Sequence, residues 1–210
     1  MNSNTRIFLT GIGTDVGKTV ASAIVAKALD ADYWKPIQAG DLNHTDSMKV
    51  AEWIGQKKVY PEAYRLHTPA SPHYAAEIDH VHIALNETHL PDTSNTLVIE
   101  GAGGILVPVN NEQLLVDALS IYTKQCIVVS RHYLGSINHT LLTTEVLTNK
   151  GFNIRGVLFV GEKNHTTEQI IIKLTGLKNL GTIPWTKNLT PDFIEQQARA
   201  LKPALETCLK

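Results

Sequence analysis

The segment GIGTDVGKT, residues 11 to 19, constrains the fold of this chain more than any other feature. It follows the apolar run RIFLT at 6 to 10 and precedes a stretch with helical spacing. The usual phosphate-binding pattern, G-x-x-x-x-G-K-[ST], would place its first glycine at position 12. This chain has Ile12 there, flanked by Gly11 and Gly13. The segment is therefore a broken phosphate-binding loop, a structural Gly-rich turn, or a variant loop with a specialised task.

The order of strand, Gly-rich turn and helix favours phosphate binding over a structural turn. Such a turn directs successive backbone N–H groups and the positive end of a helix toward one point. In a loop of this kind Gly17 lets the backbone approach the phosphates, Lys18 reaches the β and γ oxygens, and the Thr19 hydroxyl ligates Mg²⁺. The GKT end is intact, so we expect this segment to bind a nucleotide phosphate.

The rest of the chain alternates short apolar runs with helical patterns, which predicts an α/β fold with a doubly wound, mostly parallel sheet flanked by helices. We expect a single domain over residues 1–210. The predicted strands are 6–10, 31–36, 96–101, 126–130, 154–160 and 179–185. The predicted helices are 17–29, 45–55, 113–122, 137–149, 166–175 and 191–206. The least regular stretch, 56–95, is interpreted as a surface excursion that could fold over a site, and its histidines as ordinary polar surface.

Composition narrows the possible partners. The formal net charge is −1, which gives no broad basic field for nucleic acid or acidic lipid, so any anion site must be local. The two cysteines, Cys126 and Cys208, have no metal-ligand spacing and form no disulfide framework. No apolar run approaches the roughly 20 residues that span a bilayer. We expect a cytoplasmic protein that binds small molecules, with no nucleic-acid or membrane partner.

Three charged residues are predicted to join the phosphate loop at the carboxyl edge of the sheet, where open α/β sheets bind ligands. Glu100 ends the apolar run TLVIE and is the best candidate to hold a metal ion. Asp46, at the start of a predicted helix, is either a helix N-cap or a second metal ligand. Lys35, in KPIQAG, would add a second cation that neutralises charge on a transferring phosphoryl group.

A family resemblance rests on motifs that cover nearly the whole chain. The segments TGIGTDVGKT, KPIQAG, HTDSMKV, SPH, VIEGAGG, LGSINHTLLT and GTIPW resemble those of dethiobiotin synthetases in order and approximate spacing. The longer loop with Thr14 and Asp15 is similar to that family's version of the P-loop, which favours a variant loop over a broken one. The resemblance implies a P-loop NTPase fold.

The resemblance also implies a reaction. Dethiobiotin synthetases close the ureido ring from 7,8-diaminononanoate, CO₂ (or bicarbonate) and MgATP, and they release ADP and phosphate. An amine takes up CO₂ as a carbamate, and a carbamate oxygen attacks the γ-phosphate. The second amine then displaces phosphate from the carbamic-phosphoric anhydride. The implied cofactors are ATP, with other NTPs open, and Mg²⁺.

Site residues follow by analogy with the family, position by position. The implied catalytic residues are Lys35, Lys18 and Thr14. The implied nucleotide-binding residues are Gly13, Thr14, Asp15, Val16, Gly17, Lys18, Thr19, Val20 and Pro184. The implied metal ligands are Thr19, Asp46 and Glu100. The implied substrate-binding residues are Lys35, Ala39, Gly103, Gly135, Ser136 and Asn138.

The segment LGSINHTLLT, residues 134 to 143, is predicted to place a helix N-terminus where it can receive a carboxylate. In the family this region helps to form a homodimer and receives the carboxylate of the diamine across the interface. The alternative is a plain helix start with Ser136 as N-cap. His139 is interpreted as a packing or capping residue.

Two positions depart from the family pattern. Many members have an asparagine that reads the adenine where this chain has Val160, which cannot supply a donor and acceptor pair. The expectation is relaxed base selectivity, with Asn164 or the backbone near Pro184 as substitutes. Ala39 stands where the family commonly has a hydroxyl residue, and water or Gln38 is expected to replace that hydrogen bond.

Three other interpretations remain open. A cobyrinic acid amide synthase would need a glutaminase domain with a nucleophilic cysteine, for which the chain has no room. A ParA/MinD-like nucleotide switch would need a second lysine early in the P-loop, and none lies between Gly11 and Gly17. A degenerate synthetase that binds nucleotide without turnover is suggested by Val160 and Ala39, whereas the intact GKT and Lys35 argue against it.

Overall fold

Apolar, β-branched runs form the centre of the molecule. The structure is a computed structural model that describes residues 5–209. Its main sheet has seven strands, and every adjacent pair is parallel. In spatial order they are β4 (Val59–Tyr60), β2 (Asp32–Trp34), β6 (Leu97–Gly104), β1 (Arg6–Gly11), β7 (Gln125–Arg131), β8 (Asn153–Val160) and β9 (Asn179–Ile183). The central strands are buried on both faces, so their sequences are continuously apolar rather than alternating.

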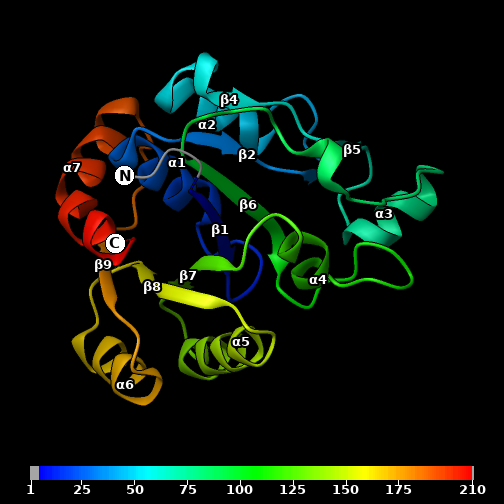
Figure 1. Ribbon diagram of the computed structural model, residues 1–210. Coiled ribbons are helices and arrows are strands. Elements are labelled where there is room, and N and C mark those ends of the chain that lie inside the picture. Colours follow the sequence, from blue (N-terminus) through cyan, green and yellow to red (C-terminus); the bar gives the residue numbers. More distant parts are fainter. Residues whose placement is uncertain (1–4, 210) are drawn as a thin grey trace.

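Helices cover both faces of this sheet. One layer consists of α1 (Lys18–Leu29), α2 (Asp46–Ile54) and α7 (Pro191–Cys208), with α1 packed against the other two. The opposite layer contains α5 (Ser136–Asn149) and α6 (His165–Thr175), as Figure 1 shows. The shorter α4 (Leu115–Ser120) packs against β6. The predicted doubly wound α/β fold is confirmed.

The winding direction reverses at β1, which lies between β6 and β7. From β1 the chain passes through α1 to β2 on one side, whereas from β7 it passes through α5 to β8 on the other. Parallel sheets of this type bind ligands outside the carboxyl ends of the strands at such a reversal. The loop at 12–17 connects β1 to α1 and therefore lies at this position.

The structure contains each predicted strand and helix, with shifted ends. The strand predicted at 96–101 continues to Gly104, so Glu100 lies within β6 and not at its end. The helix predicted at 113–122 is only α4, Leu115–Ser120. Within residues 5–209, no helix is both long and apolar enough to span a membrane.

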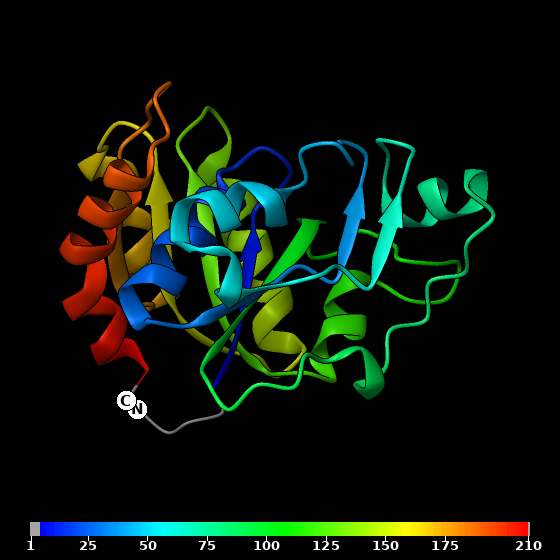
Figure 2. The ribbon, with the colours of Figure 1, turned by 90° about the horizontal axis from the view of Figure 1, so that it is seen from above.

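The stretch 56–95 is more regular than the sequence predicted. It holds the short helices η1 (Gln56–Lys58) and η2 (Glu87–His89), the strands β4 and β5 (Tyr64–Leu66), and α3 (Pro72–Ile78). β5 pairs in parallel with β3 (Ile37–Ala39) in a separate two-stranded sheet. Figure 2 shows β5 and α3 on the side of the molecule opposite α7.

Candidate active site

The loop between β1 and α1 has a backbone path that only some residues can follow. Gly17 is the N-cap of α1 with φ 88°, and Asp15 has φ 55°. A Cβ on Gly17 would lie 3.1 Å from Cγ1 of Val160 at the end of β8. Position 17 therefore requires glycine both for its backbone angle and for its close approach to Val160. The loop is held from the β7 side by Arg131, which donates to the Asp15 carbonyl oxygen at 2.9 Å.

Lys18 begins α1 and its side chain folds back over the loop. Its Nζ donates to the Gly13 carbonyl oxygen at 2.6 Å, and the residue is only 8% exposed. Burial lowers the pKa of Lys18 to about 8, against the opposing charge of Glu100. The Lys18 side chain is therefore held against the backbone of the loop that precedes it.

A second cation, Lys35, is the first residue after β2, and its side chain contacts two carboxylates. Its Nζ donates to Oδ2 of Asp46 and lies 3.5 Å from Oε1 of Glu100. Thr19 donates to the same Glu100 oxygen at 3.0 Å. Burial disfavours the Lys35 ammonium, but the charges of Glu100 and Asp46 outweigh it, so the pKa of Lys35 is raised. Lys35 is thus a cation fixed among carboxylate and hydroxyl oxygens.

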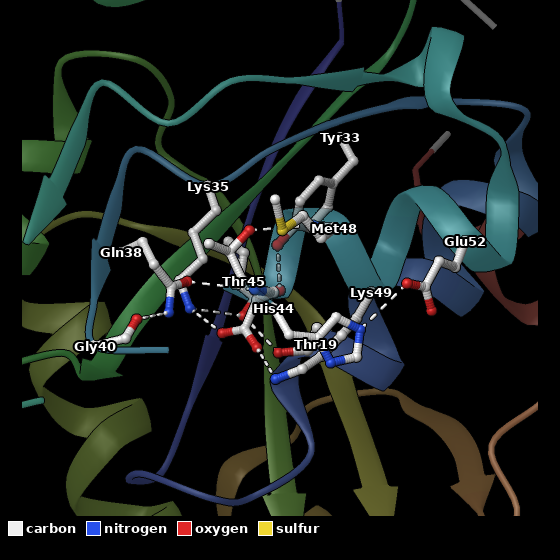
Figure 3. Close-up of polar contacts among 12 residues, drawn as sticks. Thr19, Tyr33, Lys35, Gln38, Gly40, His44, Thr45, Met48, Lys49 and Glu52 are labelled. Carbon is white, nitrogen blue, oxygen red and sulfur yellow. Dashed lines mark hydrogen bonds and ion pairs between the residues drawn. The ribbon is translucent and has the colours of Figure 1, made fainter. Parts of the chain in front are cut away.

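Asp46 is the first residue of α2 and not its N-cap. Thr45 is the N-cap, and its buried side chain accepts a hydrogen bond from the Met48 N–H. The N-cap interpretation of Asp46 is therefore wrong, and its carboxylate is available for charged partners. Burial raises the pKa of Asp46, but the Lys35 and Lys49 charges outweigh it, and the net shift is downward. Figure 3 shows Lys35 and Lys49 reaching this region from opposite sides.

Most of the predicted P-loop and metal-site residues line one cavity of about 660 Å³. Predicted residues that line it are Thr14, Asp15, Gly17, Lys18, Thr19, Val20, Lys35, Asp46, Glu100 and Gly103. Further lining residues are His44, Lys49, Glu52, Trp53, Lys187, Asn188 and Leu189. The cavity is lined from positions 14–53, 100–103 and 187–189, so the stretch 56–95 does not fold over it.

Other predicted residues have different surroundings. Gly13 contributes its carbonyl oxygen to Lys18, and the Val16 side chain is buried in the core. Pro184 lines a neighbouring cavity with Trp185, beyond the end of β9. Ala39 ends β3. The Gln38 amide donates to the Gly40 carbonyl and accepts from the Asp46 N–H, and so holds the start of α2.

Gly135, Ser136 and Asn138 lie together in a separate depression of about 1020 Å³. Gly135 is the N-cap of α5 with φ 104°, and Ser136 is its first residue, so the interpretation of Ser136 as N-cap is wrong. Leu134 is fully exposed beside them. His139 contacts the hydroxyl of Tyr133 through Nδ1 at 2.8 Å, consistent with a packing role. In one chain, this depression and the 660 Å³ cavity have no lining residue in common.

One of the two positions that depart from the family pattern, Val160, lies beside the loop. Val160 is 7% exposed beneath Gly17. Asn164, the expected substitute for base recognition, is the N-cap of α6, and its side-chain oxygen accepts the Thr167 N–H at 3.0 Å. That oxygen therefore caps α6.

Both cysteines are buried, and burial raises the pKa of Cys126 to about 12, which excludes a reactive thiolate there.

Sequence reasoning missed three residues of this region. Tyr33 donates to Glu100, Lys49 donates to Asp46, and Arg131 holds the loop. A sequence signal existed for two of them, because Tyr33 is two positions before Lys35 on a strand and Lys49 is three positions after Asp46 on a helix. Arg131 gave no local signal, since its contact joins residues far apart in the chain.

The parallel sheet, the reversal at β1 and the loop ending in GKT define a nucleotide-binding protein of the P-loop NTPase class. A family model described as an AAA domain matches residues 5–192. The MinD structures from Pyrococcus horikoshii, complexed with Mg-ADP, and from Pyrococcus furiosus share the fold, with TM-scores of 0.57 and 0.56 at 13% and 16% identity. The alignments cover 97% and 98% of this chain and 96% and 98% of those chains.

Relatives found by sequence similarity define the family more narrowly than the shared fold does. The ATP-dependent dethiobiotin synthetase BioD of Christiangramia forsetii is 52% identical over 178 residues, or 84% of this chain and 86% of that protein. The same enzyme of Afipia carboxidovorans is 45% identical over 91% of this chain and 92% of that protein, and that of Brucella ovis is 46% identical over 90% of each. The chain belongs to the dethiobiotin synthetase family, and the predicted resemblance is confirmed.

Proposed function

We propose that this protein is an ATP-dependent dethiobiotin synthetase that closes the ureido ring of 7,8-diaminononanoate with CO₂ and releases ADP and phosphate. The observation that carries the proposal is the meeting of Lys18 and Lys35 with Asp46 and Glu100 in one cavity at the end of the P-loop. Two cations and two carboxylates at this place suit a reaction in which several anions and a divalent cation meet.

The reaction has three steps. One neutral amine attacks CO₂, forms a C–N bond and loses a proton to give a carbamate. A carbamate oxygen attacks the γ-phosphorus, and the bond from that phosphorus to the β-γ bridging oxygen breaks, which releases ADP. The second amine attacks the carbonyl carbon, loses a proton and expels phosphate. No side chain forms a covalent intermediate, so positioning and exclusion of water are the main tasks of the protein.

The P-loop binds the phosphates. The backbone N–H groups of the loop and the N-terminus of α1, which begins at Lys18, would bind the β-phosphate. Lys18 would exchange its contact with the Gly13 carbonyl for phosphate oxygens, because a doubly charged phosphate is a stronger acceptor than a neutral carbonyl. Asp15 and Val16 contribute backbone groups, and Val20 continues the wall of the cavity.

Three residues would hold Mg²⁺: Thr19, Asp46 and Glu100. They fit because they offer only oxygen donors, because Asp46 and Glu100 already flank a cation, the ammonium of Lys35, and because the Thr19 hydroxyl contacts the same Glu100 oxygen. When bound, Mg²⁺ would neutralise charge on the β- and γ-phosphates. Lys35, released from the carboxylates, would then stabilise the carbamate and the transferring phosphoryl group. Thr14 lies beside Gly103 in the cavity wall, with its Oγ1 3.7 Å from where a Cβ on Gly103 would be, and would contact the reacting oxygens.

The carboxylate end of the diamine would bind at the N-terminus of α5, with Gly135, Ser136 and Asn138. Within one chain these residues line a different depression from the one that holds Lys35. A homodimer that brings the α5 N-terminus of the partner subunit to this cavity would complete the site. It would also cover the exposed side chain of Leu134.

The base would lie near the ends of β8 and β9, where Val160 and Pro184 are found. Val160 offers no hydrogen-bonding group, so we propose relaxed selectivity among ATP, CTP and GTP. Backbone groups near Pro184 would make the polar contacts to the base. Ala39 leaves the diamine without one side-chain hydrogen bond.

The test measures ADP release with MgATP and bicarbonate, with and without 7,8-diaminononanoate, while dethiobiotin is followed by mass spectrometry. We expect diamine-dependent ADP matched one to one by dethiobiotin. Lys18→Met should abolish both, whereas Lys27→Met, on the same helix but paired with Glu195 at the surface, should not. ADP release without diamine and without product would overturn the proposal in favour of a nucleotide switch.

A further inference from the structure

Tyr33 is a buried tyrosine whose hydroxyl points at the metal side of the site. The residue is completely buried in β2, and its Oη donates to Oε2 of Glu100 at 2.9 Å. Figure 3 shows Tyr33, Lys35 and Thr19 directed toward one region from β2, the segment after it, and α1. Tyr33 is not among the residues that line the cavity, so it reaches the chemistry only through Glu100.

The strand geometry explains why this contact forms. Tyr33 pairs with Val98 in the parallel register of β2 and β6, and Trp34 pairs with Ile99. Side chains at i and i+2 share a face, so Tyr33 and Lys35 lie on one face of their segment, as Val98 and Glu100 do on β6. Tyr33 is therefore two residues farther than Lys35 from the carboxyl edge of the sheet, and its hydroxyl contacts Glu100 from that side.

The two oxygens of Glu100 have different partners. Oε1 accepts from Thr19 and lies 3.5 Å from Lys35, whereas Oε2 accepts from Tyr33. Rotation of the carboxylate would break the Tyr33 contact and leave a buried oxygen without that donor. The hydroxyl of Tyr33 is the donor in this contact, because the carboxylate oxygen can only accept.

We propose that Tyr33 is a positioning residue that fixes the Glu100 carboxylate so that Oε1 faces the divalent cation. The inference rests on the proposed role of Glu100 as a metal ligand. Hydrogen bonds to ligating carboxylates set their orientation, and their loss typically costs about 10- to 100-fold in metal affinity or activity. A tyrosine that only filled space would be replaced by phenylalanine without any change in metal binding.

The test measures binding of Mn²⁺ to the complex of the protein with ADP, with free Mn²⁺ followed by electron paramagnetic resonance. Tyr33→Phe should weaken Mn²⁺ binding about tenfold or more, while the affinity for ADP without metal stays unchanged. Tyr122→Phe is the matched control, because Tyr122 is also buried and its hydroxyl donates to the Asn86 carbonyl at 2.7 Å, away from the site. This control should bind Mn²⁺ like the unmodified protein.

Double substitution separates the failure of this inference from the failure of the proposed function. Glu100→Gln should itself weaken Mn²⁺ binding, and Tyr33→Phe should then add no further loss, since its effect passes through Glu100. An effect of Glu100→Gln with none of Tyr33→Phe would overturn the positioning role alone. No effect of either would overturn the assignment of Glu100 as a ligand.

A second pair of variants covers the case in which Tyr33→Phe does not fold. At position 33, 4-aminophenylalanine keeps an N–H donor, whereas 4-methylphenylalanine fills the same space without one. The amino variant should retain Mn²⁺ affinity and the methyl variant should lose it. Equal affinity in the two variants would contradict the inference.

Discussion

Replacing Lys35 by methionine would remove the cation that neutralises two carboxylates while keeping most of the side-chain length. The Lys35 side chain is 9% exposed, and those of its partners Asp46 and Glu100 are 21% and 1% exposed. Removal of one partner from a buried ion pair leaves an uncompensated buried charge, which costs about 3–5 kcal/mol. The metal-free protein should therefore lose stability, not only activity.

The contacts that remain around Asp46 and Glu100 place the expected loss of stability near the lower limit of this range. Asp46 keeps its contact with Lys49 at 3.2 Å, and Glu100 keeps hydrogen bonds from Thr19 and Tyr33. We expect a decrease of about 3 kcal/mol in the free energy of unfolding. For a chain of this size each kcal/mol shifts Tm by about 2–4 °C, so the Tm should fall by about 6–12 °C.

Mg²⁺ should reverse this loss in the variant. A ligand at about 100 times its Kd stabilises the native state by about 2.7 kcal/mol, and in Lys35→Met the metal need not displace an ammonium. Thermal unfolding is measured with and without Mg²⁺, and Lys49→Met is the control, since a partly exposed pair contributes roughly 0–1 kcal/mol. The kcat of Lys35→Met should fall about 100- to 1000-fold with little change in nucleotide affinity.

Two results would refute this reasoning. One is a metal-free Lys35→Met protein as stable as the unmodified protein, which would mean that the carboxylates do not depend on the ammonium. The other is an equal rise in Tm with Mg²⁺ in both proteins, which would place the metal away from Lys35. Equal losses in kcat and nucleotide affinity would contradict a role for Lys35 in the transition state.

Three further predictions concern the surroundings of the site. The unmodified protein should use ATP, CTP and GTP with comparable kcat/KM, and the Val160→Asn variant should favour ATP. A preference of the unmodified protein for ATP above about 100-fold, nearly 3 kcal/mol, would contradict this prediction. Gly17→Ala should cost about 1–3 kcal/mol in urea unfolding and abolish ATP binding, because φ is 88° and the new Cβ approaches Val160; unchanged binding would refute it. Burial raises the pKa of Glu168, but hydrogen bonds from Thr182 and His132 outweigh it, so the folded pKa lies below 4.5. Its stabilisation is present above pH 4.5 and is lost as pH falls through the folded pKa, so Glu168→Gln should flatten the acid side of the urea midpoint against pH; an unchanged curve would refute it.

The sequence predicted the elements whose signals are local. Buried parallel strands are continuous apolar runs, and α1 follows directly from the loop that Gly17 terminates. β3, β4 and β5 were missed because each has only two or three residues and, unlike β2, none stands in a longer segment that was recognised as a strand. β3 and β5 are defined by pairing with each other, which joins segments distant in the chain.

The same division holds for the candidate site. Lys18 and Thr19 were predicted from a contiguous motif, and in the structure Lys18 contacts the Gly13 carbonyl and Thr19 contacts Glu100. The roles of Tyr33 and Arg131 depend on which strands are neighbours, and this follows from the spatial order of the sheet rather than from either residue's own surroundings in the sequence. The spacing of Tyr33 and Lys35 indicates that they share a face of the chain, but the partner of Tyr33, Glu100, lies on a different strand and is identified only by the structure.

The fold shared with the MinD structures explains where a nucleotide binds but not what is done with it. The distinguishing feature is a buried ammonium, Lys35, between the carboxylates of Asp46 and Glu100. A buried ion pair contributes little to stability compared with apolar residues of similar size, so packing alone gives no reason for this arrangement. In the proposed reaction the arrangement would keep a lysine charged beside the space where a divalent cation and a phosphoryl group would meet, and would release it when the carboxylates gain a better partner. The charge arrangement at the end of β2, more than the sheet itself, therefore points to a phosphoryl-transferring ligase.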